Sequence, residues 1–422
     1  MGNLVGLLGV IFILLVAYLM SNNRKAIKWR VVSAGLLLQL IFGILVMRTT
    51  PGRMFFDVCN RVIIRLLSFT NEGSGFLFGT IISGKPVNMG FVFAFQVLPT
   101  IIFVSSLMSI AYYLGVMQKI VEIFARIFVK IMGTSGAESL SNSANIFVGQ
   151  TEAPLLIKPY VSEMTNSELM TVMVGGFATV AGGVMAAYVG MLKDYIPNIA
   201  GFLLTASIMA APAGLALSKM VYPETGEPKT KGMVKIPYTK TDVNVIDAAA
   251  NGASAGLTLA FNVGGMLLAF IALIAMLNFG FAFVGNIINS VFGTSVSLSL
   301  QLILSWIFSP VAWLMGVPWQ DCRIVGQFLG EKLVLNEFVA YLNMMKQLVV
   351  DPNLIGPKAK LIASFALCGF ANFSSIAIQI GGIGGIAPDR RHDLAKLGLR
   401  AMVVGMLANL MTGTIAGILF TG

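Results

Sequence analysis

The feature that most constrains this chain is a long stretch without charge. Residues 251–320 contain no Asp, Glu, Lys or Arg. A helix needs about 20 mainly apolar residues to cross the hydrocarbon core of a bilayer. This stretch is therefore long enough for one span and for further helix embedded in the membrane, and it predicts a chain that folds in lipid.

The composition also indicates a membrane solvent. Of the 422 residues, 57% are hydrophobic and 11% are charged, whereas soluble domains carry about 25% charged residues. The net charge of +10 does not indicate nucleic acid as a partner. Lys and Arg gather in short clusters between apolar runs, as they do on the cytoplasmic side of membrane proteins.

Few residues are available to build an enzyme active site. His392 is the only histidine and lies in a charged stretch, which excludes a two-histidine metalloprotease motif and disfavours a buried serine–histidine pair. Cys59, Cys322 and Cys368 are far apart and form no zinc or disulfide pattern. We therefore predict that the protein is not an enzyme.

The pattern of apolar runs predicts an all-α polytopic membrane protein with eight transmembrane helices. Two further segments, 50–85 and 118–132, are predicted to be interfacial helices. In 118–132, apolar residues that include Ile123 and Phe128 take one face, and charged residues take the other. The predicted spans are 4–20, 31–47, 91–114, 169–192, 199–217, 255–283, 361–380 and 394–420.

The basic residues orient these spans. The first span has no basic residue before it and a basic cluster at 24–30 after it, which predicts an uncleaved helix with its N-terminus outside. Alternation then places the loop 218–250, with Lys219 and further lysines, in the cytoplasm. The protein is predicted to lie in the cell inner membrane, with both termini outside the cytoplasm. The basic residues of 48–85 run against this orientation.

Two segments do not fit as simple spans. Residues 136–165 and 318–350 each have about ten apolar-biased residues on either side of a polar tip. Ten residues of helix measure about 15 Å, half the hydrocarbon thickness, so each segment is predicted to be a re-entrant hairpin whose tip lines a cavity or is buried in protein. Pro154 suits the first turn of one half-helix, and Asn336 can cap another.

Each hairpin precedes an apolar helix with a weak centre. The centres are ATVAGG at 178–183 and FANFSS at 370–375, where small and polar residues interrupt a span. Hairpin, broken helix and plain helix thus occur twice, separated by an odd number of spans. That order predicts an inverted repeat with a binding site at the membrane midplane.

Two carboxylates are predicted at membrane depth, Glu152 and Glu337. A charge there costs at least a few kcal/mol. One interpretation is an ion pair with a nearby lysine, for example Lys158 or Lys332; the other is contact with a ligand or ion in a polar cavity. The polar neighbours that would share such a cavity are Gln150, Thr151, Asn372 and Ser375.

Four motifs carry a resemblance to a known family: FAFQVLP at 93–99, GQTEAP at 149–154, NEFVAY at 336–341 and CGFANFSSI at 368–376. With them the chain resembles the concentrative nucleoside transporter family, in its compact bacterial, sodium-coupled form, over essentially its whole length. The resemblance implies a homotrimer in which a scaffold domain makes the trimer and a transport domain carries the substrate by alternating access.

The resemblance also implies a domain organisation. Residues 1–135 would be mainly scaffold and interfacial helices, and 136–217 the first transport repeat. Residues 218–317 would be the cytoplasmic loop, a long scaffold helix and an interfacial helix, and 318–422 the second transport repeat.

The same resemblance implies two sets of site residues. The nucleoside set has the base facing the first hairpin tip and the ribose held by the second half: Gln150, Thr151, Glu152, Val184, Glu337, Phe370, Asn372 and Ser375. The sodium set consists of the Asn145 side chain, the Val148 carbonyl, the Thr179 hydroxyl and the Val180 carbonyl; many relatives have Ser in place of Thr179.

The implied function is import of nucleosides by symport with sodium. A proton-coupled nucleoside carrier and a carrier of another small polar solute, such as a nucleobase or sugar, are the alternatives. A channel is disfavoured, because re-entrant hairpins around a carboxylate-lined site suit alternating access better. The sequence does not distinguish purine from pyrimidine nucleosides.

Overall fold

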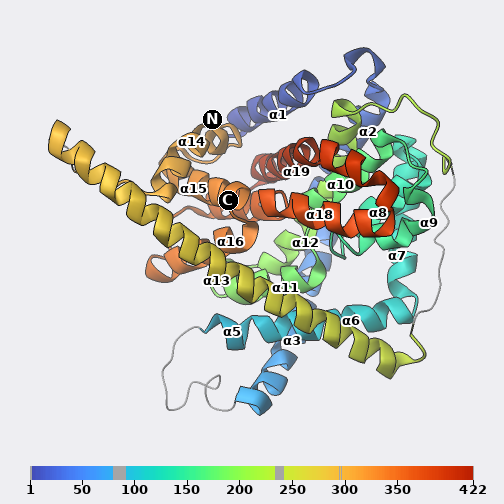
Figure 1. The fold of residues 1–422 in the computed structure, drawn as a ribbon, viewed down its shortest axis with the longest axis horizontal. Helices are drawn as coiled ribbons and strands as arrows, with labels where there is room; N and C mark the ends of the chain where they lie inside the picture. The colour runs from blue at the N-terminus through green and yellow to red at the C-terminus, as the bar shows by residue number, and fades with distance from the viewer. Residues whose placement is uncertain (1, 79–91, 233–241, 294, 296, 422) are drawn as a thin grey trace.

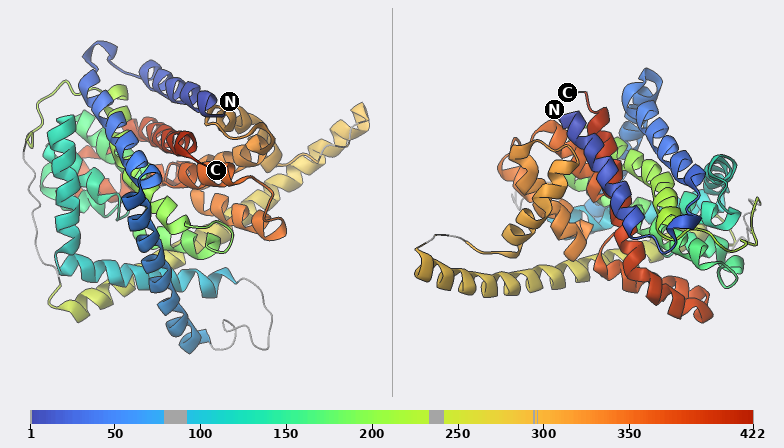
Figure 2. Two further views of the ribbon diagram at one scale, coloured as in Figure 1. Left: turned by 180° about the vertical axis from the view of Figure 1, so that it is seen from behind. Right: turned by 90° about the horizontal axis from the view of Figure 1, so that it is seen from above.

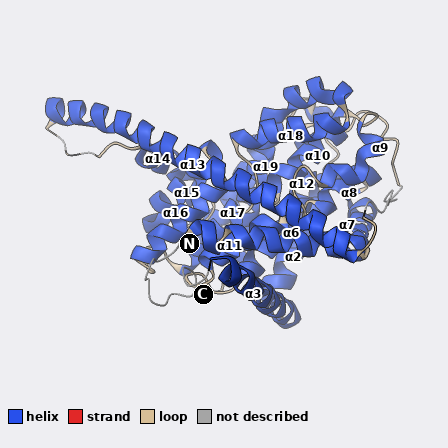
Figure 3. Ribbon diagram, turned by 60° about the horizontal axis from the view of Figure 1, so that its bottom comes forward, coloured by secondary structure: helices blue, strands red, loops and turns tan. Residues whose placement is uncertain are grey.

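The structure is a computed structural model that describes residues 2–78, 92–232, 242–293, 295 and 297–421. Throughout this described part, helices are joined by loops (Figure 3). The predicted all-α class is therefore confirmed. The helices pack into one bundle from which α13 (Val245–Phe292) projects at its C-terminal end (Figure 1).

Six of the described helical segments are long and apolar enough to cross a membrane: Trp29–Arg48, Phe93–Tyr113, Asn166–Leu192, Ile199–Val221, Val245–Phe292 and Pro388–Leu419. They overlap six of the eight predicted spans. In the other two, 4–20 and 361–380, the apolar helices are shorter, Leu4–Leu19 and Phe373–Ile386. The protein is thus a polytopic membrane protein, and the count of eight spans stays a prediction.

Outside the two repeats, the chain forms a framework of helices. Its elements are α1 (Gly2–Leu19), η1 (Arg24–Ala26), α2 (Trp29–Arg48), α3 (Thr50–Phe78), α5 (Phe93–Gln96), α6 (Leu98–Tyr113), α7 (Val116–Met132), α13 and α14 (Leu300–Leu314). The helices α6 and α13 approach closely at Gly252 and Gly256. A Cβ atom on either glycine would lie 2.8 Å from a backbone atom of α6, so small residues spaced four apart permit this contact.

The two segments predicted to be interfacial are both helical. Residues 50–78 form the single helix α3, and the rest of the predicted segment lies outside the described residues. In α7 the buried stripe passes through Val121, Ala125 and Phe128, whereas Ile123 is 58% exposed. Of the predicted apolar face, Phe128 thus packs on the bundle, whereas Ile123 does not. Val121 and Ala125 pack on the bundle, and Ile123 is left on a flank that lipid can cover.

The two predicted hairpins are present as short helical elements on either side of a tip. Hairpin 1 consists of α8 (Gly136–Ala144), η2 (Ala153–Ile157) and α9 (Lys158–Val161), and hairpin 2 consists of η3 (Trp319–Asp321), α15 (Cys322–Val334) and α16 (Glu337–Val350). Pro154 lies in the first turn of η2, as predicted. Asn336 caps α16, because its Oδ1 atom accepts a hydrogen bond from Val339 N at 2.9 Å.

Both predicted helix breaks are present too. The first broken helix is α10 (Asn166–Ala178) and α11 (Gly182–Leu192), and the second is α17 (Pro357–Leu367) and α18 (Phe373–Ile386). We call residues 179–181 the first break and residues 368–372 the second break. The helices α12 (Ile199–Val221) and, after η4 (Pro388–Arg390), α19 (Arg391–Leu419) complete the two series. Figure 2 shows them side by side in the middle of the bundle.

One lysine assigned to the polar loop 218–250 belongs to a buried cluster instead. The helix α12 continues to Val221, and Lys219 is only 6% exposed. Its ammonium group lies 2.6 Å from Glu138 Oε2 and 3.4 Å from Glu224 Oε2. Because a charge inside a protein is stable only when it is paired, Lys219 joins α12 to hairpin 1 and is no marker of the cytoplasmic side.

Candidate functional site

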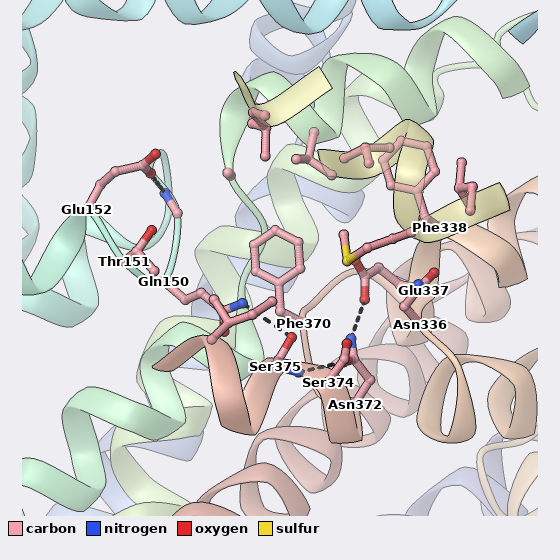
Figure 4. A pocket seen from close by; sticks show the side chains of 18 residues that line it. Gln150, Thr151, Glu152, Asn336, Glu337, Phe338, Phe370, Asn372, Ser374 and Ser375 are labelled. Atoms are coloured by element: carbon pink, nitrogen blue, oxygen red, sulfur yellow. Dashed lines mark hydrogen bonds between the residues drawn. The ribbon is translucent and has the colours of Figure 1, made fainter. Parts of the chain in front are cut away.

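The two hairpin tips and the two breaks meet around one cavity of about 140 Å³ (Figure 4). All eight residues of the predicted nucleoside set line it: Gln150, Thr151, Glu152, Val184, Glu337, Phe370, Asn372 and Ser375. Some of them are far apart in the chain, such as Gln150 and Ser375 with 225 residues between their positions, so the fold brings together what the motifs suggested separately.

Glu337 is held firmly at this cavity. It is 4% exposed and is the first residue of α16, where the helix dipole favours a negative charge. Tyr188 Oη donates a hydrogen bond to its Oε1 atom at 3.1 Å, and Asn372 Nδ2 donates to its Oε2 atom at 2.8 Å. Each oxygen of a carboxylate can accept a further hydrogen bond, so both can still bind hydroxyl groups of a ligand.

The second break orients Asn372 for this contact. Asn372 caps α18, since its Oδ1 atom accepts from Ser375 N at 2.9 Å and from Ser374 Oγ at 2.7 Å. Its Nδ2 atom is therefore the group that faces Glu337. Figure 4 shows this chain of contacts from the start of α18 to the tip of hairpin 2.

Gln150 connects the first tip to the second half of the site. Its Nε2 atom donates to Ser375 Oγ at 3.2 Å, and its Oε1 atom accepts from Gln379 Nε2 at 3.0 Å. The amide thereby has a fixed orientation. Gln379 and Tyr188 are supporting residues that the sequence reasoning missed; a lone amide or phenol inside an apolar helix is the signal that could have found them.

Glu152 has a different environment. Its side chain is exposed, and its Oε2 atom accepts a hydrogen bond from Gly149 N of the same tip (Figure 4). Glu152 also lines a second cavity of about 650 Å³ that reaches Tyr112, Asp242 and Asn251. It therefore stands between the two cavities.

The alternative in which both glutamates form ion pairs with lysines is not what the structure contains. The lysine suggested for Glu152, Lys158, is exposed, and no ion pair within 4.0 Å joins it to Glu152. Lys332 Nζ donates instead to Ala366 O at 2.8 Å and to Asn409 Oδ1 at 2.6 Å. Among the described residues, both carboxylates are thus left to face the cavity.

An apolar wall completes the cavity. It is formed by Phe338 and Phe370 and by α13, which contributes Leu259, Val263, Met266 and Leu267. The ring centroids of Phe338 and Tyr188 are 4.9 Å apart, so this wall is itself well packed. A cavity with a polar floor and an apolar wall suits a ligand that has a flat ring and several hydroxyl groups.

The four residues of the predicted sodium set lie where the first tip meets the first break. Gly182 N donates to Phe147 O at 2.9 Å and joins the two segments. Asn145 is fully buried, and neither its Oδ1 nor its Nδ2 atom has a hydrogen-bond partner. Thr179 Oγ1 donates to Gly175 O at 2.8 Å, which leaves its lone pairs free.

A buried amide without partners is rare in folded proteins, and a hard cation prefers oxygen ligands. The chemistry of these groups therefore fits a small cation. The described residues contain no cluster of His, Cys, Asp or Glu that could hold a transition metal.

Two hairpins and two broken helices around a polar cavity inside an apolar bundle define a secondary transporter. Comparison with known proteins identifies which one. The family described as "Na+ dependent nucleoside transporter" matches at residues 8–81 for its N-terminal part and 202–417 for its C-terminal part, and a "Nucleoside recognition" domain matches residues 94–195. The chain belongs to this family of sodium-dependent nucleoside transporters, and it is not an enzyme.

Relatives and solved structures agree with this assignment. An "Uncharacterized transporter" of Haemophilus influenzae is 46% identical over 100% of this chain and 99% of its own length. "Sodium/nucleoside cotransporter 1" of Mus musculus is 42% identical over 99% of this chain, which spans 64% of the mouse protein.

The structure of CNTnw in an inward-facing substrate-bound state has a TM-score of 0.89 at 45% identity and covers 99% of this chain and 98% of its own. A double variant of CNTnw in an outward-facing state, which covers the same shares, has a TM-score of 0.92. The fold of this family is therefore found in both states that alternating access requires.

Proposed function

We propose that this protein imports nucleosides by symport with sodium, through alternating access of a transport domain. The observation that carries the proposal is the environment of Glu337. A carboxylate fixed by Tyr188 and Asn372 beside an apolar wall can accept hydrogen bonds from two neighbouring ribose hydroxyl groups. A site built on such contacts rejects a solute that lacks those hydroxyls.

The base would lie toward the first hairpin tip. Gln150 and Thr151 offer donors and acceptors to a base edge, and Phe370 and Val184 offer apolar surface to its ring. Glu337, Asn372 and Ser375 would hold the ribose. In this arrangement the base lies mainly against the first half and the ribose against the second, with Phe370 of the second half also contacting the base.

Sodium would bind as the co-transported ion between the first tip and the first break. The ligands would be the Asn145 side chain, the Thr179 hydroxyl, and the carbonyl groups of Val148 and Val180. The unpartnered Asn145 amide supports this proposal. None of the four groups titrates near neutral pH, which favours sodium over the alternative of a proton.

The second cavity, of about 650 Å³, would be the path between the substrate site and the cytoplasm. It shares Glu152, Ala181 and Leu259 with the substrate cavity and reaches Asp242 of the loop 218–250. A third cavity of about 430 Å³ lies among α3, α16 and Asp194, and it shares no lining residue with the substrate cavity. The arrangement fits a conformation in which the site communicates with the inner side.

The remaining expectations are proposals about placement. The transport domain would consist of 136–217 and 318–422, and the other two segments would form the scaffold of a homotrimer. The protein would lie in the inner membrane with both termini outside.

Labelling a cysteine in the loop 218–250 tests the orientation. Thr230 is 5% exposed whereas Glu227 is exposed, so Glu227→Cys is the better probe. Labelling from the periplasm would contradict the orientation.

Uptake of labelled uridine into proteoliposomes tests the function. We expect accumulation with an inward sodium gradient and little uptake without sodium; adenosine, measured in parallel, reports the base preference. Uptake driven by a pH gradient without sodium would indicate the proton-coupled alternative. Strong competition by free ribose or uracil would indicate a carrier of another small solute.

A further inference from the structure

The two breaks touch each other at the centre of the bundle. Phe370 N in the second break donates a hydrogen bond to Thr179 O in the first, at 3.3 Å. Gly369 has a φ of 148°, and a Cβ atom there would lie 2.8 Å from Ala178 O and 2.5 Å from Asn409 Oδ1. Only glycine permits this approach, because a side chain would collide with the Ala178 carbonyl next to the first break and with Asn409.

Asn409 bridges both breaks from the side. It lies in α19 and is fully buried. Its Nδ2 atom donates to Ala178 O at 2.6 Å and to Cys368 O at 2.8 Å. These carbonyl groups lie at the end of α10, just before the first break, and at the start of the second break. One amide group thus uses both of its N–H bonds to tie the two breaks together.

Lys332 decides which way this amide points. The side chain comes from hairpin 2 and is fully buried, and its ammonium group donates to Asn409 Oδ1 at 2.6 Å. An ammonium group has no acceptor, so the amide atom facing it must be the oxygen. The Nδ2 atom then faces the two carbonyls. Lys332 also donates to Ala366 O in the last turn of α17, where a positive charge is favoured by the helix dipole.

The two breaks carry the two halves of the proposed site. The first provides Thr179 and Val180 for sodium, and the second provides Phe370 and Asn372 for the nucleoside. We propose that Asn409, oriented by Lys332, is a positioning residue that couples sodium binding to nucleoside binding. This inference rests on the proposed function, in which these residues bind the two ligands.

The coupling works through the order of the two breaks. Sodium bound to the Thr179 hydroxyl and the Val180 carbonyl fixes the first break and, with it, the carbonyl of Ala178. Asn409, which is hydrogen-bonded to both carbonyls, would then fix Cys368 in the second break as well. The same break contains Asn372, which donates a hydrogen bond to Glu337. The nucleoside then meets a break that is already ordered, and the gain in affinity is reciprocal for the two ligands.

The test measures the coupling itself in purified full-length protein. The dissociation constant of uridine without sodium, divided by its value in saturating sodium, is the coupling factor. We expect Asn409→Leu and Lys332→Met to lower this factor at least about fivefold, a step at the lower end of typical coupling factors. The shift that uridine causes in the sodium concentration for half-maximal binding should decrease by the same factor.

Thr414→Val is the matched control. Thr414 is a fully buried polar residue of the same helix, and its hydroxyl donates only to Leu410 O of that helix, at 2.7 Å. The control should keep the coupling factor. If Asn409→Leu does not fold, Asn409→Ser, which retains one hydroxyl donor, should give an intermediate factor.

An unchanged coupling factor in the Asn409 and Lys332 variants overturns the inference, even if uridine and sodium both bind more weakly. A purely structural role would raise the dissociation constant of uridine by the same factor with and without sodium, and the ratio of the two constants would not change. An equal decrease in Thr414→Val overturns it as well. Uridine binding that ignores sodium in the unaltered protein is a different outcome: it overturns the proposed function, and the inference with it.

Discussion

The two halves of the candidate site differ in how completely their polar groups are satisfied. In the second half, both oxygens of Glu337 accept hydrogen bonds, and Asn372 uses its Oδ1 and its Nδ2 atoms. In the first half, Asn145 has no partner for either polar atom, and Glu152 has one, from its own hairpin tip. The second half is organised by contacts within the protein, whereas in the first half Gln150 is held across the site but Asn145 and Glu152 are not.

Local structure explains this difference. Asn336 and Asn372 cap α16 and α18, so the two helices of the second half begin with ordered N-termini at the cavity. The first tip continues instead into the 3-10 helix η2, whose first residues have no side-chain cap. A buried amide left without partners costs about 1–3 kcal/mol, and a bound cation would remove that cost at Asn145. The contrast suggests a sugar-binding half and an ion-binding half.

Glu337→Gln should have the largest effect on substrate affinity. The new amide N–H would face Tyr188 or Asn372, which both donate, and the charge would be lost. Hydrogen bonds to charged groups contribute about 1.5–3 kcal/mol, so uridine should bind roughly 10- to 100-fold more weakly. Titration with uridine and its 2′- and 3′-deoxy analogues measures this, and the analogues should lose less.

Glu331→Gln is the control for that change. Glu331 is fully buried in α15, where its Oε1 atom accepts from Gln327 and Asn343 at 3.0 Å, and it does not line the cavity. It should leave the preference for uridine over the deoxy analogues unchanged. Equal weakening of uridine and its analogues in Glu337→Gln would mean that Glu337 does not contact the sugar.

Thr179→Val should show the ion-binding character of the first half. It keeps the shape of the side chain and removes one oxygen ligand, a loss that we place at about 1–1.5 kcal/mol by analogy with a hydrogen bond. The sodium concentration for half-maximal uptake should rise about five- to tenfold, with less effect at saturating sodium. Uptake measured over a sodium series tests this.

Thr205→Val is the matched variant for Thr179→Val. Thr205 is also buried and donates to the carbonyl four residues earlier, Gly201 O, at 2.7 Å. It should not change the sodium dependence. If the two variants behave alike, the hydroxyl of Thr179 does not bind the ion.

Glu152→Gln should lower the affinity for uridine about fivefold, which corresponds to the loss of one hydrogen bond of about 1 kcal/mol. Because Glu152 is expected to face the base, uridine and 2′-deoxyuridine should lose affinity equally, in contrast to the Glu337 variant. A loss confined to uridine would show that both glutamates act on the sugar, and the division between the two halves would fail.

Tyr188→Phe should have the smallest effect. It removes one donor to Glu337, worth about 0.5–1 kcal/mol net, so uridine affinity should fall about two- to fivefold and more than that of the deoxy analogues. Tyr341→Phe is the control. The two rings are 4.4 Å apart, but Tyr341 Oη donates to Ser364 O. A sugar-specific loss in the control would assign the effect to packing.

Much of the site was predictable from local patterns. Polar residues inside apolar runs predicted both hairpin tips and both breaks, because a membrane helix tolerates such residues only where the backbone turns or lines a cavity. Asn336 and Pro154 were predicted in their capping and first-turn positions from residue type alone. These features depend only on residues that are close together in the chain, so they can be recognised directly from the sequence.

Contacts between distant residues were not predictable, for the opposite reason. Lys219 was assigned to the polar loop, and Lys332 was named only in one of two interpretations of the glutamates. Lys219 pairs with Glu138, and Lys332 bonds to Asn409; these partners are 81 and 77 residues away in the chain. No local pattern identifies them.

The sequence by itself thus determined the membrane solvent, the helices, the positions where they break and the family. The tertiary structure decided which polar groups meet: Glu337 with Tyr188, Gln150 with Ser375, and Asn409 with both breaks. The physical reason is range. Helix formation and helix breaking follow from residues within one or two turns, whereas a hydrogen bond in the core requires two distant segments to be packed to within about 3 Å of each other.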